Sequence, residues 1–283
     1  MEIEDTFSEV FEMHYSEILV TAISSELALT IANNATGFAT SVIGCDCEAG
    51  IDRLMESEQT PDDRPGVVVG FFAISMDKLK KSLLDRVGQS VLTAPSARVF
   101  NVVENGEPHD LGKKLSFFGD GHQKRIERYG RTMWSIPVMA GEFLVEENVL
   151  LSKGVSGNFQ ILGRSEEETI GTSMDAVNAI NRIPGAITPF PAGICASGSK
   201  VGSRYPFLSA STDEGMCPSL EVNKLPAGTR SVCEIVIDAK DDETLRNAMK
   251  AGMGACNNTS TIKITAGNFC GKLGKSKIYL RRL

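Results

Sequence analysis

The chain has 283 residues, of which 42% are hydrophobic and 23% are charged, a composition typical of folded globular proteins and unlike that of disordered ones. Its formal net charge of −7 argues against a general role in nucleic-acid binding, which usually needs a basic face. Only three histidines are present, so we expect neither a histidine-based metal centre nor a Ser-His-Asp triad.

The first half of the chain alternates predicted strands with predicted helices. The apolar run VVVGFFAI is typical of a strand buried on both faces. The leucines that follow it recur at helical spacing and indicate an amphipathic helix. The elements predicted here are a strand at 17–22, a helix at 24–33, a strand at 67–74, a helix at 76–89, and strands at 115–118 and 135–143.

The second half of the chain follows the same order. Each half has the strand-helix-strand rhythm of a ferredoxin-like α+β unit. The pattern alone leaves an internal duplication and a chance similarity both open. The elements predicted here are a strand at 160–162, a helix at 165–181, a strand at 232–238, a helix at 241–253 and a strand at 261–265.

The seven cysteines are irregularly spaced and form no CxxC pair. We therefore expect neither a zinc ribbon nor a disulfide framework. The N-terminal residues are acidic and lack the apolar core of a signal peptide, and no apolar run is long enough to cross a membrane. A cytoplasmic protein with reduced thiols is the resulting expectation.

Glu234 is the first candidate for catalysis. It interrupts the apolar segment 232–237, where burial would raise the pKa of its carboxyl group to a range that suits proton transfer near neutral pH. The competing interpretation is simple strand alternation, in which Cys233 and Ile235 face the core and Glu234 faces solvent. A nucleophilic cysteine is a further hypothesis, although no histidine is spaced to activate one.

Glycine-rich segments are the second kind of candidate. Residues 193–202 and 266–275 combine glycines, hydroxyls or amides and lysine, and could offer backbone N–H groups and a cation to a carboxylate or phosphate. Residues 117–122 place Asp120 and His122 in a turn. Each segment could equally be a flexible connection or a solvated surface.

An ordered set of motifs resembles the formylmethanofuran:tetrahydromethanopterin formyltransferases. The matches extend from residue 5 to about residue 274, in the order in which they occur in that family. The motifs are DTF at 5–7, TGFATSVI at 36–43, EAGI at 48–51, TPDDRPG at 60–66, LDRVGQ at 84–89, KLSFFGDG at 114–121, IPV at 136–138, GEF at 141–143, PFP at 189–191, SGSKVGS at 197–203, EIVI at 234–237, AGN at 266–268 and KLG at 272–274.

The resemblance implies a reversible formyl transfer in one-carbon metabolism, in methanogenesis or formaldehyde oxidation. Formylmethanofuran would be the donor and N5 of tetrahydromethanopterin the acceptor, with no bound prosthetic group and no metal. It further implies an α+β fold of two duplicated ferredoxin-like lobes, at 1–150 and 151–283, and a homotetramer built as a dimer of dimers. The resemblance also implies formylmethanofuran dehydrogenase-like or hydrolase subunits as partners, and no nucleic-acid or membrane partner is expected.

The resemblance also implies roles for individual residues. Glu234 matches the position of the proton-transferring acid/base, and backbone N–H groups of the glycine-rich turns would stabilise the oxyanion. Lys200, Arg204 and Lys272 are expected to face the anionic tails of the two coenzymes. The residues expected to bind substrate are Thr40, Ser41, Gly119, Asp120, Pro189, Phe190, Ser199, Lys200, Arg204, Asn268 and Lys272.

Several positions depart from the family pattern. Asp63, Ala192, Ser156 and Cys270 stand where the resemblance leads us to expect glycine, and side-chain atoms there could narrow a pocket. Residues 213–216 (DEGM) replace an Asn-Asp-Ala-Tyr-like stretch. Three alternatives therefore stay open: a free-standing enzyme, a subunit of a bacterial formyltransferase/hydrolase complex, and a paralogue that only binds or scaffolds.

Overall fold

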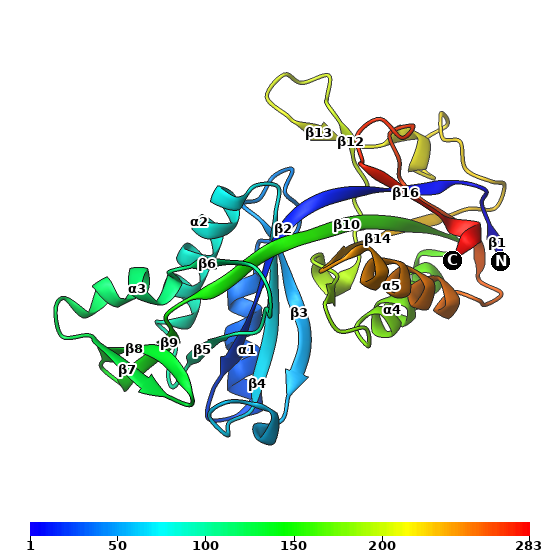
Figure 1. Cartoon of the computed structure of the whole chain (residues 1–283). Coiled ribbons are helices and arrows are strands. Elements are labelled where there is room, and N and C mark those ends of the chain that lie inside the picture. Colours follow the sequence, from blue (N-terminus) through cyan, green and yellow to red (C-terminus); the bar gives the residue numbers. More distant parts are fainter. The chain divides into compact units, whose positions relative to one another are not determined.

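The computed structural model describes residues 1–283, and its contacts divide the chain into two compact units. Unit 1 comprises Met1–Glu12, Ile43–Cys45 and Val155–Leu283, and unit 2 comprises Met13–Val42 and Asp46–Gly154. The chain passes between the units inside two long strands, β2 and β10, and also on either side of the short segment Ile43–Cys45 (Figure 1). The units assign the first twelve residues to the C-terminal part of the chain, whereas the lobes at 1–150 and 151–283 remain a prediction about domains.

Unit 2 is built around a βαββαβ core. Its strands lie in the order β3-β4-β2-β5, and all neighbours are antiparallel. Counted along the core as the first to the fourth strand, this order is 2-3-1-4, which is the strand order of a ferredoxin-like sheet. Every residue of β4 is buried, as the apolar run predicts. The elements of the core are β2 (Phe7–Thr21), α1 (Ser25–Thr36), β3 (Glu48–Met55), β4 (Gly66–Ala73), α2 (Met76–Arg86) and β5 (Arg98–Asn101).

A second group of elements extends this sheet beyond β5. The order continues β5-β9-β8-β7, with β9 parallel to β5. The strand predicted at 115–118 is wrong, because these residues end a helix and form a 3-10 turn. The predicted strand 135–143 is two strands separated by a turn at Met139. The elements are β6 (Glu107–His109), α3 (Leu111–Ser116), β7 (Lys124–Arg128), β8 (Arg131–Val138) and β9 (Gly141–Glu146).

Unit 1 repeats the βαββαβ core. Its strands lie in the order β11-β14-β10-β15, and their neighbours are again antiparallel. The elements are β10 (Val149–Gly163), α4 (Glu166–Ile180), β11 (Ala186–Ile187), β14 (Ser231–Ala239), α5 (Asp242–Ala255) and β15 (Thr261–Thr265). Outside this core are β1 (Glu2–Ile3), β12 (Lys200–Val201), β13 (Ala210–Ser211) and β16 (Ser276–Tyr279).

The two cores therefore share both their element order and their strand order, which confirms the duplicated ferredoxin-like α+β fold. Their four helices also begin alike: the side chains of Ser24, Ser75, Ser165 and Asp241 each accept a hydrogen bond from the backbone N–H three residues later. None of the helices is both long and apolar enough to cross a membrane.

Each unit has its own hydrophobic core. In unit 1, Phe159 and Ile161 of β10 and Ile235 and Ile237 of β14 pack against α4 and α5. Burying each of these side chains contributes roughly 1.5–3 kcal/mol. Because side chains alternate along a strand, Gln160, between Phe159 and Ile161, and Glu234, next to Ile235, project from the opposite face of the sheet.

Candidate active site

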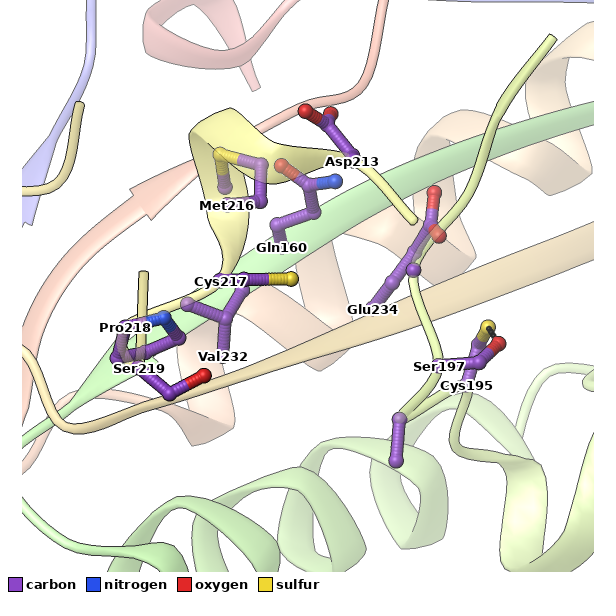
Figure 2. A pocket seen from close by; sticks show the side chains of 12 residues that line it. Gln160, Cys195, Ser197, Asp213, Met216, Cys217, Pro218, Ser219, Val232 and Glu234 are labelled. Atoms are coloured by element: carbon purple, nitrogen blue, oxygen red, sulfur yellow. Dashed lines mark hydrogen bonds between the residues drawn. The ribbon is translucent and has the colours of Figure 1, made fainter. Parts of the chain in front are cut away.

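Glu234 projects from β14 into a cavity of about 140 Å³ within unit 1 (Figure 2). The cavity forms because the long connection between β11 and β14 covers the face of the sheet that strand alternation leaves polar. Both interpretations of the sequence are thus partly right: Cys233 and Ile235 do face the core, yet Glu234 is not in open solvent. The wall includes Gln160, Cys195, Ser197, Asp213, Cys217 and Glu234.

The backbone fixes Glu234 from both sides. On one side, Gln160 of β10 is its direct partner in the antiparallel ladder. On the other side, the N–H of Glu234 donates to the Cys195 carbonyl at 2.9 Å, and the N–H of Cys195 donates to the Glu234 carbonyl at 2.8 Å. The covering segment is therefore attached to the sheet at the same residue that carries the carboxylate.

The carboxyl group of Glu234 has no hydrogen bond or ion pair with another residue. Burial raises its pKa from 4.5 to about 7, and the negative charge of Asp213 adds to this effect. A carboxyl group with this pKa exists in both protonation states near neutral pH. It can therefore accept a proton from one group and return it to another.

The turn after β15 flanks this carboxylate. The N–H of Gly267 donates to Asn158 Oδ1 at 2.8 Å. A Cβ added at Gly267 would lie 3.5 Å from Glu234 Oε1, so the backbone of the turn closely approaches the acid. Glycine at this position keeps one side of the carboxylate open.

Glu9 of β2 holds the rest of this turn in place. Its buried carboxylate accepts four backbone N–H groups, from Phe269 at 2.7 Å, Gly271 at 2.5 Å, Leu273 at 3.1 Å and Gly274 at 2.6 Å. Burial acts to raise the pKa of Glu9, but these donors outweigh it and the pKa lies below 4.5. The expectation that this turn supplies an oxyanion hole is wrong for these four N–H groups, because Glu9 occupies them.

The predicted substrate-binding residues of unit 1 lie outside the cavity wall. Ser199 and Lys200 follow directly after the wall residue Gly198, and Lys200 Nζ donates to Glu214 Oε1 at 2.6 Å. Arg204 is exposed at the tip of the β12–β13 hairpin. Pro189 and Phe190 precede a short 3-10 helix that begins at Pro191.

Two further predicted residues belong to the turn after β15. The side-chain amide of Asn268 donates to the Phe7 carbonyl at 3.1 Å and to Thr6 Oγ1 at 3.2 Å, so it fastens the turn to β2. Lys272 is exposed on the same turn. Glu234 is consequently the only predicted site residue that lines the cavity.

Unit 2 holds the remaining four predicted residues. Thr40 and Ser41 lie in the turn after α1, and Gly119 and Asp120 end the 3-10 turn after α3, with Asp120 exposed at φ 47°. Arg86 braces the first of these turns: its guanidinium donates to Asp46 Oδ1 at 2.6 Å and Oδ2 at 3.0 Å and to the Gly37 carbonyl at 2.8 Å. This contact gives the LDRVGQ motif a structural role.

Two wall residues, Gln160 and Asp213, are not among the residues predicted from the sequence to form the site. Gln160 is a polar residue inside an apolar segment, just as Glu234 is, and that shared feature was available as a signal. Asp213 was noticed only as part of a departure from the family pattern. Its place opposite Glu234 depends on how the connection of more than forty residues folds back over the sheet.

The departures from the family pattern have a backbone explanation. Asp63, Ala192 and Cys270 adopt φ values of 53°, 54° and 58°, in the left-handed region that glycine enters without strain. Ser156 differs, because it lies inside β10 with an ordinary strand conformation. The three non-glycine residues therefore keep the backbone path that glycine would take.

The cysteine thiols and the potential metal ligands form neither a disulfide nor a metal site. All seven cysteines are free thiols. No group of three or more His, Cys, Asp or Glu side chains is placed to hold a metal ion.

Comparison with known proteins extends over the whole chain. Residues 1–138 match the family model of formylmethanofuran-tetrahydromethanopterin formyltransferase, and residues 141–283 match the model of the proximal lobe of that family. The formyltransferase of Methanopyrus kandleri is 47% identical over 290 residues, covering 100% of this chain and 98% of the relative. That of Methanothermus fervidus is 48% identical, with the same coverage of both chains.

Two solved structures agree with this match. The formyltransferase of Methanosarcina barkeri is 44% identical and superposes with a TM-score of 0.95, covering 100% of this chain and 98% of the other. A chain of the formyltransferase/hydrolase complex of Methylorubrum extorquens, solved with methylofuran, is 41% identical with a TM-score of 0.94, covering 99% and 96%. The chain belongs to the formylmethanofuran-tetrahydromethanopterin formyltransferase family.

Proposed function

We propose that this chain transfers a formyl group reversibly between the amine of methanofuran and N5 of tetrahydromethanopterin, as part of one-carbon metabolism. The full-length relatives are named for this reaction. The observation that carries the proposal is Glu234, a carboxyl group with a pKa of about 7 in a cavity, free of any other partner.

The reaction needs one proton shuttle. The acceptor nitrogen attacks the formyl carbon and forms a new C–N bond, while the carbonyl electron pair moves to oxygen and gives a tetrahedral oxyanion. The attacking nitrogen loses a proton to the carboxylate of Glu234. When the oxyanion collapses, the old C–N bond breaks and Glu234 returns the proton to the leaving nitrogen. Atoms and charge balance with the two coenzymes alone as reactants.

The surroundings of Glu234 fit this role. The covering segment at 195–219 shelters the carboxyl group from bulk water, which would otherwise compete for the formyl group. Ser199 and Lys200, next to the wall, and the exposed Arg204 and Lys272 are proposed to bind the coenzymes, the cations taking their anionic tails. Thr40, Ser41, Gly119, Asp120, Pro189, Phe190 and Asn268 remain proposed contacts.

A direct assay tests the proposal. Purified protein is incubated with formylmethanofuran and tetrahydromethanopterin, and formation of formyl-tetrahydromethanopterin is followed spectroscopically. We expect turnover without added cofactor, and we expect the reverse reaction from formyl-tetrahydromethanopterin and methanofuran. Binding of the pterin without any formyl transfer would instead support a paralogue that only binds or scaffolds.

The structure weakens the main argument for such a paralogue. That reading was based on residues that replace expected glycines, and three of them keep the left-handed backbone that glycine would adopt. The side chains at these positions have therefore not changed the local backbone conformation. We therefore prefer the enzyme.

Assembly and location are further parts of the proposal. We infer a homotetramer, or alternatively a subunit in a complex with hydrolase chains like that of Methylorubrum extorquens. Light scattering of the purified chain and co-purification from its native source distinguish the two. A cytoplasmic location is supported by the seven free thiols, which suit a reducing compartment.

A further inference from the structure

The side-chain amide of Gln160 lies in the cavity that contains Glu234 and is not hydrogen-bonded to another residue. Only 9% of the residue is exposed, yet its side chain makes no hydrogen bond to any other residue. The amide faces the cavity, where its oxygen and nitrogen are free to bind water or a ligand. Such a group is expected where a ligand supplies the missing partner.

The sheet fixes the backbone that carries this amide. β10 is paired on both sides at Gln160, with Glu234 of β14 and with Thr265 of β15. Figure 2 shows Gln160 and Glu234 projecting from these neighbouring strands to the same side. By contrast, Ala196 and Ser197 lie in an exposed connection. Side chains on central strands hold catalytic geometry better than side chains on loops.

The wall contains no positive charge. Its only ionisable carboxyl groups are those of Glu234 and Asp213, and it includes no Lys, Arg or His. Among the side chains of the wall, only neutral groups can therefore donate a hydrogen bond to a negatively charged oxygen that develops in this cavity. The amide NH₂ group of Gln160 is such a donor, and it cannot lose its proton to the oxyanion.

We propose that Gln160 is a second catalytic residue, whose Nε2–H₂ group donates a hydrogen bond to the formyl oxygen as that oxygen becomes the oxyanion. The inference rests on the proposed function and assigns a separate task to each cross-strand neighbour. Glu234 moves the proton between the two nitrogens. Gln160 stabilises the charge on oxygen and exchanges no proton.

The test compares Gln160→Met with the wild-type protein in single-turnover formyl transfer. Methionine has a similar volume but no N–H donor, so we expect the single-turnover rate constant to fall by roughly 10²–10³-fold, the usual effect of removing one oxyanion donor. The pH dependence of the remaining activity should keep its midpoint, because Glu234 is intact. Lys153→Met is the matched control: it lies on the same strand, is exposed, and should keep wild-type activity.

A second variant guards against a loss that merely reflects misfolding. In Gln160→Glu, the donor returns only when the new carboxyl group is protonated, so its activity relative to that of Gln160→Met at the same pH should rise as the pH falls. Thermal unfolding and pterin binding of both variants are measured alongside. If Gln160→Met folds and keeps activity within about threefold of the wild-type protein, the inference is wrong and loop N–H groups stabilise the oxyanion. An inactive wild-type protein would overturn the proposed function itself.

Discussion

Gln160 and Glu234 are direct cross-strand neighbours, paired residue to residue between β10 and β14 of unit 1. Their backbones exchange the contacts of an antiparallel ladder, and their side chains share one face of the sheet and one cavity. The pair explains why a polar residue interrupts each of two apolar strands at the same level. A carboxyl group and an amide are thereby held at a separation that the sheet itself determines.

Because the pKa of Glu234 is raised, the free energy of unfolding should depend on pH near neutrality. The unfolded chain binds no proton at this residue above about pH 4.5, whereas the folded chain keeps one until about pH 7. The free energy of unfolding therefore falls as the pH rises through this interval, by up to about 3 kcal/mol. The loss is expected in the wild-type protein and not in Glu234→Gln. Denaturant unfolding from pH 4.5 to 8 measures it, and equal pH dependence in both proteins would contradict the buried carboxyl group.

Asp213 should contribute to the raised pKa of Glu234. Its negative charge helps to raise the pKa of Glu234, and it is the only other charged residue in the cavity wall. In Asp213→Asn the amide can still accept the N–H of Gly215, which Asp213 Oδ1 accepts at 3.0 Å, so the local turn is preserved. We expect the midpoint of the pH–rate profile to move to lower pH by up to about one unit. Glu221→Gln removes an exposed charge on the same connection and should leave the midpoint in place.

Glu9 should stabilise the turn beside Glu234. Replacing its carboxylate with the amide of glutamine puts an NH₂ group against backbone N–H donors, and we expect a loss of about 2 kcal/mol or more in the free energy of unfolding. Since its pKa is lowered, the stabilisation in the wild-type protein should persist above pH 4.5 and decline as the pH falls further. Glu12→Gln on the same strand breaks an exposed ion pair with Lys275 and should cost less than Glu9→Gln. Equal losses in the two variants would show that the four N–H contacts do not matter.

Relief of left-handed strain should stabilise the chain at two positions. A non-glycine residue in this region costs about 1–2 kcal/mol, and part of the gain from glycine is offset by the greater freedom of the unfolded chain. We expect Ala192→Gly and Cys270→Gly each to raise the free energy of unfolding by about 0.5–1 kcal/mol. Ser156→Gly, inside β10, should lower it by a similar amount. A loss of stability in the first two variants would refute the strain.

The sequence predicted the fold well because local signals agreed with it. The apolar run of β4, the capped helices and their repeated order were all readable, and they define the two cores. The strand expected at 115–118 failed because a short apolar segment carries no information on period. Leu115 is buried from a helix rather than from a strand.

The site was only partly predictable. Glu234 stands out in the sequence because burying a carboxylate in an apolar strand costs free energy unless the carboxylate is paired. Gln160 and Asp213 could not be placed, since their proximity to Glu234 depends on strand register and on the path of the connection at 188–230. The side chain of Asn268 fastens a turn to β2, a contact between opposite ends of the chain that the sequence does not predict, and its proposed contact with substrate stays a prediction.

The rate of formyl transfer by Glu234→Gln tests the central claim most directly. Glutamine keeps the shape of the side chain but cannot carry the proton between the two nitrogens. Single-turnover transfer from formylmethanofuran to tetrahydromethanopterin, measured at pH 7 with both coenzymes saturating, should be slower than in the wild-type protein by roughly 10²–10⁴-fold, with pterin binding unchanged. A folded Glu234→Gln protein that transfers the formyl group at the wild-type rate would show that Glu234 is not the proton shuttle.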